Sequence, residues 1–129
     1  MQERSEKMRV LIVDDDILCA EITASIVLHC GYEATINDNG AAALRTIQSN
    51  PSGFDLVIMD LLLGDGNGLA VAKQIREVSS KVGFLFVTGY DLNEHQDMKK
   101  EIEKIGKALQ KPVHRDVLKA EIDNVAKAA

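Results

Sequence analysis

The sequence predicts an α/β protein: a single doubly wound (βα)5 domain with helices on both faces of a five-stranded parallel sheet. Short apolar runs rich in β-branched residues are typical of buried parallel strands. Segments with the apolar spacing of helices alternate with these runs five times. Parallel strands need crossover connections, which helices normally provide. The length of 129 residues fits one hydrophobic core of ordinary size.

The first strand and helix have clear boundaries. The apolar run of residues 8–13 predicts a strand. A helix is expected over residues 17–30, because the carboxylate of Asp16 can cap its first turn and Gly31 can end it. A second, shorter strand is expected over residues 32–36.

The middle of the chain repeats this alternation. A helix is expected over residues 41–49, and the sequence Asn-Pro-Ser-Gly at residues 50–53 ends it. The third strand is expected over residues 54–59. The glycine-rich sequence of residues 64–68 predicts a loop, and residues 69–78 predict the next helix.

The last third of the chain completes five strand and helix pairs. The run of residues 84–87 predicts a strand, and residues 93–105 predict a helix that Gly106 ends. A short strand is expected over residues 108–110. Apolar residues at helical spacing predict a final helix over residues 113–127.

Composition and charge restrict the classes of function. The net charge of −5, without a basic stripe, argues against direct binding to nucleic acid or to anionic membranes. No apolar run is long enough to span a bilayer. We expect a cytoplasmic protein with a polar N-terminal extension at residues 1–7 and one domain at residues 8–127.

The cysteines and histidines have no spacing typical of a disulfide or a metal site. Cys19 and Cys30 lie eleven residues apart on one expected helix. That spacing separates them by roughly 16 Å along the axis, which is too far for a disulfide. We expect both to be small buried residues. His29, His95 and His114 are expected at the surface.

Residues that can bind phosphate or a hard cation stand where the expected strands end. Asp14 and Asp15 follow the first strand, Asp60 follows the third, Thr88 the fourth and Lys111 the fifth. Open α/β sheets bind ligands at the carboxyl ends of their strands, so these residues predict one site. Neighbouring carboxylates repel unless a cation lies among them, and carboxylate oxygens select hard ions such as Mg²⁺. A carboxylate can itself form an aspartyl phosphate.

These segments together resemble the receiver domain of two-component response regulators, the CheY-like family. The resemblance rests on Val-Asp-Asp at residues 13–15, Asp-Leu-Val-Ile-Met-Asp at 55–60, Thr-Gly at 88–89 and Lys-Pro at 111–112. It extends from Met8 to about Val125. The order and spacing of the four segments make a strong joint signal. The resemblance implies a sheet with strand order 2-1-3-4-5.

The resemblance also implies an acceptor and a metal site. Asp60 is implied to be the phosphoacceptor, which takes a phosphoryl group from a phosphohistidine. Asp15 is implied to bind Mg²⁺ directly, and Asp14 directly or through water. Asp60 and the backbone carbonyl of Leu62 are implied to complete the metal site.

The remaining implied roles concern the phosphoryl oxygens and the partners. Lys111 is implied to pair with Asp60 and then with the phosphoryl group, and Thr88 to hydrogen-bond that group. The Lys111–Pro112 bond is implied to be cis. The implied partner is a histidine kinase or a histidine phosphotransfer protein. The implied function is that of a signalling module whose conformation alters partner binding, and not of an enzyme with external substrates.

Two departures from the family pattern bear on activation. Gly64 replaces a common proline, so we expect the loop after Asp60 to be more mobile. Ala108 replaces the usual tyrosine or phenylalanine, so the aromatic rotamer switch of the family cannot operate there. We expect the switch region to include Thr88, Gly89 and Tyr90 instead, although Tyr90 also fits a simple exposed loop residue.

Two other functions fit the fold class. A phosphatase of the haloacid dehalogenase type needs a second aspartate two residues after its nucleophile, which Asp60 lacks, while residues 14–16 have that spacing without the other motifs. A flavin or nucleotide binder needs a glycine-rich loop after the first strand, where residues 14–16 are acidic.

Asp65 is expected to have a local role in its turn. Both a natural single-domain regulator and a piece of a longer protein fit the sequence.

Overall fold

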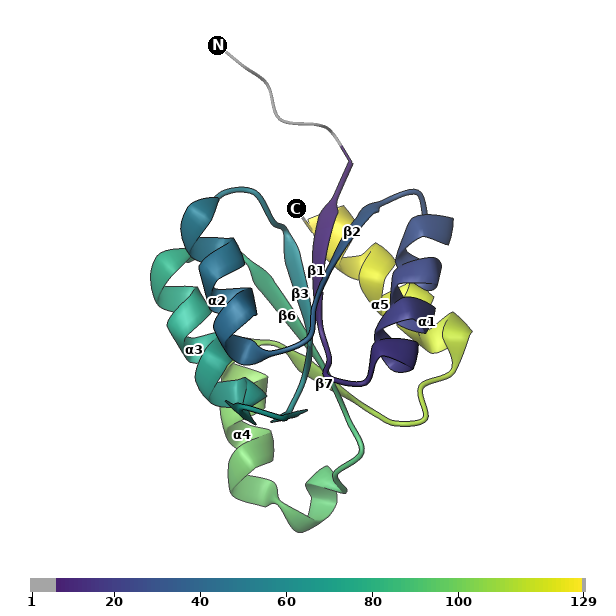
Figure 1. Ribbon diagram of the computed structural model, residues 1–129. Coiled ribbons are helices and arrows are strands. Elements are labelled where there is room, and N and C mark those ends of the chain that lie inside the picture. The colour runs from purple at the N-terminus through teal and green to yellow at the C-terminus, as the bar shows by residue number, and fades with distance from the viewer. Residues whose placement is uncertain (1–6, 129) are drawn as a thin grey trace.

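The computed structural model describes residues 7–128, and five parallel strands form its main sheet (Figure 1). Every neighbouring pair in this sheet is parallel, which confirms the predicted doubly wound fold and the implied order 2-1-3-4-5. From edge to edge the strands are β2 (Glu33–Asn37), β1 (Arg9–Val13), β3 (Leu56–Asp60), β6 (Gly83–Thr88) and β7 (Lys107–Gln110).

Helices cover both faces of this sheet (Figure 1). One face is covered by α1 (Ile17–His29) and α5 (Arg115–Ala128), and the other by α2 (Gly40–Ser49), α3 (Gly68–Val78) and α4 (Gln96–Ile105). This arrangement follows from right-handed crossovers between parallel strands.

The two faces carry separate hydrophobic clusters because successive strand residues point to opposite sides of a sheet. In β1, Leu11 and Val13 pack with buried residues of α2, α3 and α4, whereas Val10 and Ile12 pack with those of α1 and α5. Every residue of β3 is buried, as expected for the central strand. Hydrophobic packing on both faces of the sheet therefore fixes the position of β3 and of its carboxyl end.

The helix boundaries confirm the predicted capping residues. The carboxylate of Asp16 accepts hydrogen bonds from the N–H groups of Leu18 and Cys19, at 3.1 and 3.3 Å. Gly31 follows α1 with φ 91°, a left-handed conformation that favours glycine. These contacts are local, which explains why the sequence predicts both ends of α1.

The segment after Asp60 differs from the expected loop. It forms an antiparallel hairpin of β4 (Leu62–Leu63) and β5 (Gly66–Asn67), in which Leu62 pairs with Asn67 and Leu63 with Gly66. Backbone pairing over such a short segment leaves no clear hydrophobic pattern, so the sequence does not predict these two strands.

Several boundaries differ by one to three residues from the predicted ones. The 3-10 turn η1 (Leu92–Glu94) precedes α4, where the sequence predicts a continuous helix from residue 93. The last helix begins at Arg115 and not at Val113, because the segment after β7 first makes a bend with a cis peptide at Lys111–Pro112. The implied cis bond is confirmed.

The cysteine prediction is confirmed in one respect and wrong in another. Cys19 and Cys30 are free thiols, as expected, but both are only partly buried.

The predicted surface position of the three histidines is confirmed. No helix within residues 7–128 is long and apolar enough to cross a membrane. Residues 1–6 of the expected N-terminal extension lie outside the described part of the chain.

Candidate functional site

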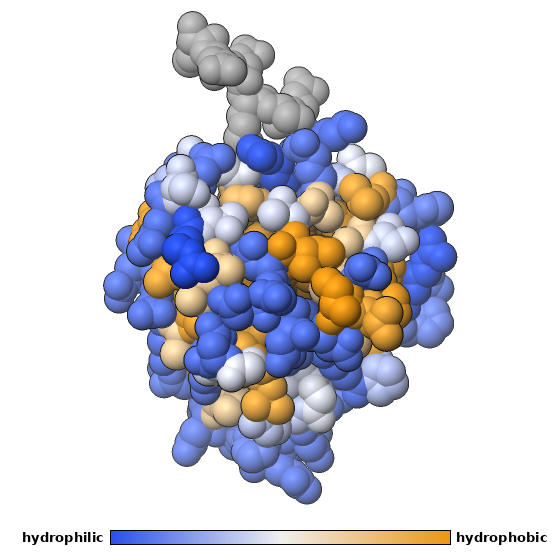
Figure 2. All heavy atoms as spheres, in the orientation of Figure 1, coloured by the Kyte–Doolittle hydropathy of each residue, from blue (hydrophilic) through white to orange (hydrophobic). Residues whose placement is uncertain are grey.

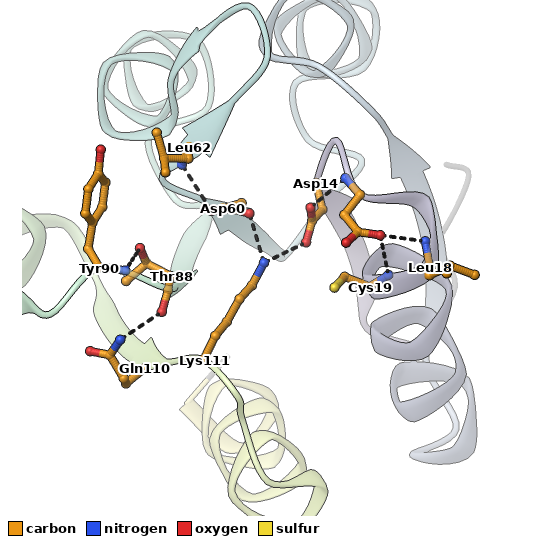
Figure 3. A network of polar contacts seen from close by, with 10 residues as sticks. Asp14, Leu18, Cys19, Asp60, Leu62, Thr88, Tyr90, Gln110 and Lys111 are labelled. Atoms are coloured by element: carbon orange, nitrogen blue, oxygen red, sulfur yellow. Dashed lines mark hydrogen bonds and ion pairs between the residues drawn. The ribbon is translucent and has the colours of Figure 1, made fainter.

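Four strand ends meet at one edge of the sheet, as the sequence predicts (Figure 3). Asp14 directly follows β1, Asp60 is the last residue of β3, Thr88 is the last residue of β6, and Lys111 directly follows β7. The register pairs Asp60 with Val87 and Thr88 with Gln110, so these ends are level with one another. The fold thereby gathers residues that lie up to 97 positions apart in the sequence.

Three carboxylates form the acidic part of the site. One oxygen from each of Asp14, Asp15 and Asp60 lies within 4.8 Å of the others. Asp14 and Asp60 are buried, with 7% and 9% of their surface exposed, whereas Asp15 is exposed. Burial raises the pKa of the Asp14 carboxyl, and the nearby charge of Asp60 adds to this effect. A cation is the natural partner for such a cluster.

Lys111 is the cation that reaches this cluster from the chain itself (Figure 3). Its Nζ lies 2.9 Å from Oδ2 of Asp60 and 3.3 Å from Oδ2 of Asp14. Burial lowers the pKa of Lys111, but the hydrogen bonds and charges of Asp60 and Asp14 outweigh that effect and raise the pKa. Lys111 is therefore charged at neutral pH. One ammonium faces three carboxylates, which leaves excess negative charge.

Asp60 is oriented by two different donors. The N–H of Leu62 donates to Oδ1 of Asp60 at 3.0 Å, and Lys111 binds Oδ2. The start of α3 packs directly on the backbone of Asp60, because a Cβ at Gly68 would lie 2.1 Å from the Asp60 carbonyl oxygen. Only glycine permits this approach, so Gly68 helps to position the acceptor strand.

Thr88 is fully buried beside the acidic cluster. Its Oγ1 accepts a hydrogen bond from the N–H of Tyr90 at 3.0 Å, and its carbonyl accepts one from the N–H of Lys111 at 2.6 Å. The side chain is thus bound to the loop that follows β6, and the backbone is bound to the segment that carries the lysine. The donation from Tyr90 leaves the hydroxyl proton of Thr88 available to another acceptor.

Tyr90, two residues after Thr88, is only partly exposed. Tyr90 packs against the hydrophobic cluster on the α4 side of the sheet, which Ala108 also contacts. Its ring makes an edge contact with His95 at 5.3 Å between centroids. The interpretation of Tyr90 as a simple exposed residue is therefore wrong. The sequence could not show the burial, because the cluster that Tyr90 packs against is assembled from strands and helices far apart in the chain.

Asp65 has a contact that sequence reasoning missed. Its two carboxylate oxygens accept hydrogen bonds from the N–H groups of Gly40 and Ala41, at 2.9 and 3.1 Å. These hydrogen bonds lower the pKa of Asp65. Asp65 lies in a turn, as expected, but its side chain also binds the start of α2, about 25 residues earlier in the chain.

An apolar pocket of about 410 Å³ opens beneath the charged residues, between α1 and the start of α5. Asp14, Asp60 and Lys111 line one end of it. Aliphatic side chains line most of the remainder, among them Ile22, Ile26, Val87, Val113 and Leu118.

The residues of the site fit Mg²⁺. Carboxylate oxygens are hard ligands, and a site with few protein ligands leaves positions for water and phosphate oxygens, as Mg²⁺ requires. Asp14, Asp15 and Asp60 supply such oxygens within 4.8 Å of one another. Softer nitrogen or sulfur ligands do not take part in this group, which argues against zinc.

The fold and the site together define a class: a doubly wound α/β domain with carboxylates, a threonine and a lysine at the carboxyl edge of its sheet. The family model of the response regulator receiver domain matches residues 10–123. The chain belongs to that family. It is thus a receiver domain of the two-component systems, a class of signalling modules.

Curated relatives agree with this assignment. The chain is 29% identical over 124 residues to the response regulator receiver protein CpdR of Brucella abortus, a match that covers 94% of this chain and 98% of CpdR. It is 36% identical over 83 residues to the two-component response regulator ORR23 of Oryza sativa, which covers 64% of this chain but 12% of ORR23. The match therefore spans nearly all of one relative and about one eighth of the other.

Solved structures are similar over almost the whole chain. A CheY-like receiver domain from Methanospirillum hungatei has a TM-score of 0.84 at 25% identity, with 95% of each chain covered. A CheY-like receiver domain from Methylobacillus flagellatus has a TM-score of 0.80 at 28% identity, with 92% of this chain and 98% of that chain covered.

Proposed function

We propose that this receiver domain accepts a phosphoryl group on Asp60 and uses the modification to alter its binding to another protein. The observation that carries the proposal is the position of Asp60. It ends the buried central strand, its Oδ2 contacts Lys111, and it shares a cluster with two further carboxylates. A carboxylate in this setting can act as a nucleophile toward phosphorus.

The proposed metal is Mg²⁺, held by Asp14, Asp15, Asp60 and the backbone carbonyl of Leu62. When bound, it would neutralise negative charge on the phosphoryl oxygens. The excess of carboxylates over cations supports this assignment. Lys111 supplies a second positive charge from the chain, at the Asp60 oxygen.

The proposed transfer forms one bond and breaks one. A carboxylate oxygen of Asp60 bonds to phosphorus, and the bond between phosphorus and the donor imidazole nitrogen breaks. The electron pair of that bond stays on the imidazole. Lys111 contacts Asp60, and Thr88 ends the neighbouring strand β6. Both would bind phosphoryl oxygens and hold the phosphoryl group in place without forming a covalent bond.

The proposed donor is a phosphohistidine on a histidine kinase or a histidine phosphotransfer protein, in the cytoplasm. The surface of α1 supports a protein partner beside the site. Ile17, Leu18 and Ile22 are 53%, 68% and 63% exposed, and α1 starts directly after the acidic residues. Figure 2 shows hydrophobic side chains gathered right of centre, in the region where Figure 1 places α1. Such patches are typical of protein contacts.

Mass spectrometry of the intact protein tests this function. Incubation with Mg²⁺ and acetyl phosphate should add one base-labile phosphoryl group. Asp60→Asn should abolish the adduct, whereas Asp65→Asn should retain it at saturating Mg²⁺. Full labelling of the Asp60→Asn variant would contradict the assignment of the acceptor. Multiple turnover of a generic phosphate ester would instead indicate a phosphatase.

A further inference from the structure

The hairpin after Asp60 is hydrogen-bonded to a distant helix through the side chain of Asp65. Asp65 occupies the two-residue turn between β4 and β5, and its carboxylate binds the N–H groups of Gly40 and Ala41 at 2.9 and 3.1 Å. These are the first two residues of α2. The positive end of the helix dipole favours a carboxylate at this place.

The attachment completes the N-terminus of α2. The side chain of Asn39 accepts a hydrogen bond from Ala42 at 2.7 Å, and the carbonyl of Asn39 accepts one from Ala43 at 3.2 Å. Without Asp65, two of the first four N–H groups of α2 would lose their hydrogen-bond acceptors. Asp65 and Asn39 therefore cap the same helix from two different segments of the chain.

The same hairpin also contacts the acidic site, through Leu62 and Gly64. Leu62, its first residue, donates its N–H to Asp60, and Leu63 is buried. A Cβ at Gly64 would lie 3.4 Å from Oδ2 of Asp15. The hairpin is also closed at its base, where the N–H of Gly68 donates to the carbonyl of Leu61 at 2.9 Å. Asp65 thus connects the turn of the hairpin to α2 by hydrogen bonds, while the buried Leu63 shares a hydrophobic cluster with Ala43 and Ile47 of α2.

We infer that Asp65 is a positioning residue for the metal site: by binding the start of α2 it holds the hairpin so that Leu62 and Asp15 keep their places around Asp60. This inference rests on the proposed function. Gly64 and Gly66 give the turn conformational freedom, and Gly66 has φ 155°. The contact with α2 supplies the restraint that these glycines do not, so the predicted freedom of this loop is limited by tertiary structure.

The test compares Asp65→Ala with two matched controls. Asn39→Ala removes a different cap of α2 and leaves the hairpin contact. Asp38→Ala removes an exposed carboxylate at the same edge of the sheet. Asp65→Asn is the conservative variant, because its single amide oxygen can replace one of the two accepted hydrogen bonds.

Mg²⁺ titrations followed by amide chemical shifts give the main readout. We expect Asp65→Ala to weaken Mg²⁺ binding about tenfold, as removal of supporting contacts around a metal commonly does. Asp65→Asn should fall between this variant and the unmodified protein. Asn39→Ala and Asp38→Ala should remain within about twofold of the unmodified protein. At saturating Mg²⁺, all four variants should accept phosphate from acetyl phosphate.

A second readout needs no metal. In the metal-free protein, Asp65→Ala should accelerate amide hydrogen exchange at Gly66 and Asn67 more than Asn39→Ala does. An unchanged Mg²⁺ affinity in Asp65→Ala, or an equal loss in Asn39→Ala, would overturn the positioning role. Absence of Mg²⁺ binding by the unmodified protein would instead contradict the proposed function itself.

Discussion

The ammonium group of Lys111 lies 2.9 Å from the carboxylate of Asp60 and also contacts Asp14 at 3.3 Å. One lysine thus connects two buried carboxylates that end neighbouring strands. Removing one partner from such a group leaves charges that the remaining groups do not compensate.

Lys111→Met should destabilise the metal-free protein by about 2 kcal/mol, because Asp14 and Asp60 lose their cation. Mg²⁺ should recover much of this loss, since a ligand that binds only the folded state stabilises it. Urea unfolding with and without Mg²⁺ measures both effects. Lys81→Met, at an exposed lysine, is the control and should change the stability little. Equal stability of the two variants without Mg²⁺ would contradict the structural role of Lys111.

Asp15→Asn should weaken Mg²⁺ binding at least tenfold and slow phosphorylation by acetyl phosphate to a similar degree, because its oxygen belongs to the carboxylate group. Asp16→Asn is a closely matched control. The Asp16 side chain caps α1 and should not affect the metal. Amide shifts around Asp60 report the affinity, and an unchanged affinity in Asp15→Asn would argue against the metal site.

Asp14→Asn should raise the free energy of unfolding of the metal-free protein at pH 7, by about 1 kcal/mol, because it removes a buried charge. Burial raises the pKa of Asp14, so the folded state binds this proton more tightly than the unfolded state. Asp14 therefore contributes most to the free energy of unfolding below its ordinary pKa. This contribution is lost as the pH rises through the raised pKa.

The gain in the free energy of unfolding from Asp14→Asn should shrink as the pH falls through the raised pKa of Asp14. Asp14 is then protonated in the unmodified protein, so the variant no longer removes a charge. Urea unfolding between pH 8 and pH 4 follows this trend. Asp16→Asn should instead lower the free energy of unfolding at neutral pH, because hydrogen bonds from Cys19 and Leu18 lower the pKa of Asp16 and stabilise its charged form. This loss should shrink as the pH falls. A difference for Asp14→Asn that grows toward low pH would contradict the argument.

Activation should move the loop after Thr88 and the start of α4. A phosphoryl group that recruits the Thr88 hydroxyl gains a charge-assisted hydrogen bond of about 2 kcal/mol. Such a gain shifts a two-state equilibrium roughly thirtyfold. The N–H of Tyr90, now bound to Thr88, and the ring contact with His95 provide the connection to α4.

A beryllofluoride adduct should therefore perturb the amide shifts of residues 89–95 strongly and those of the exposed face of β7 weakly. Ala108 presents only a methyl group on β7 and cannot rotate into a vacated space. Thr88→Ala should greatly reduce the changes at residues 89–95. Changes confined to β7 and α5 would show that this account of the switch is wrong.

Gly68→Ala should cost on the order of 2 kcal/mol or more, because the added methyl would meet the Asp60 carbonyl oxygen at 2.1 Å. Gly89→Ala is the control for stability, since a Cβ there would meet no atom within 4 Å. Thermal or urea unfolding compares the two. A stability loss of equal size in both variants would indicate that the close approach of α3 to Asp60 is not the cause.

Much of the fold follows from local features of the sequence. The buried strands are recognisable as apolar runs, and Asp16 and Gly31 mark the ends of α1 through contacts within a few residues. The residues at the strand ends also follow from the sequence, because parallel strands bring their carboxyl ends to one edge. The differences of one to three residues in the boundaries arise where the termini of elements depend on neighbouring segments.

Other features depend on partners far apart in the chain, and only the tertiary structure decided them. Nothing near Asp65 in the sequence indicates a contact with Gly40 and Ala41, and nothing near Tyr90 indicates its packing against the hydrophobic cluster on the α4 side of the sheet. The sequence by itself determined which residues stand at the carboxyl edge. Side-chain packing between separate elements decided how these residues are held, because such contacts have no periodicity along the chain.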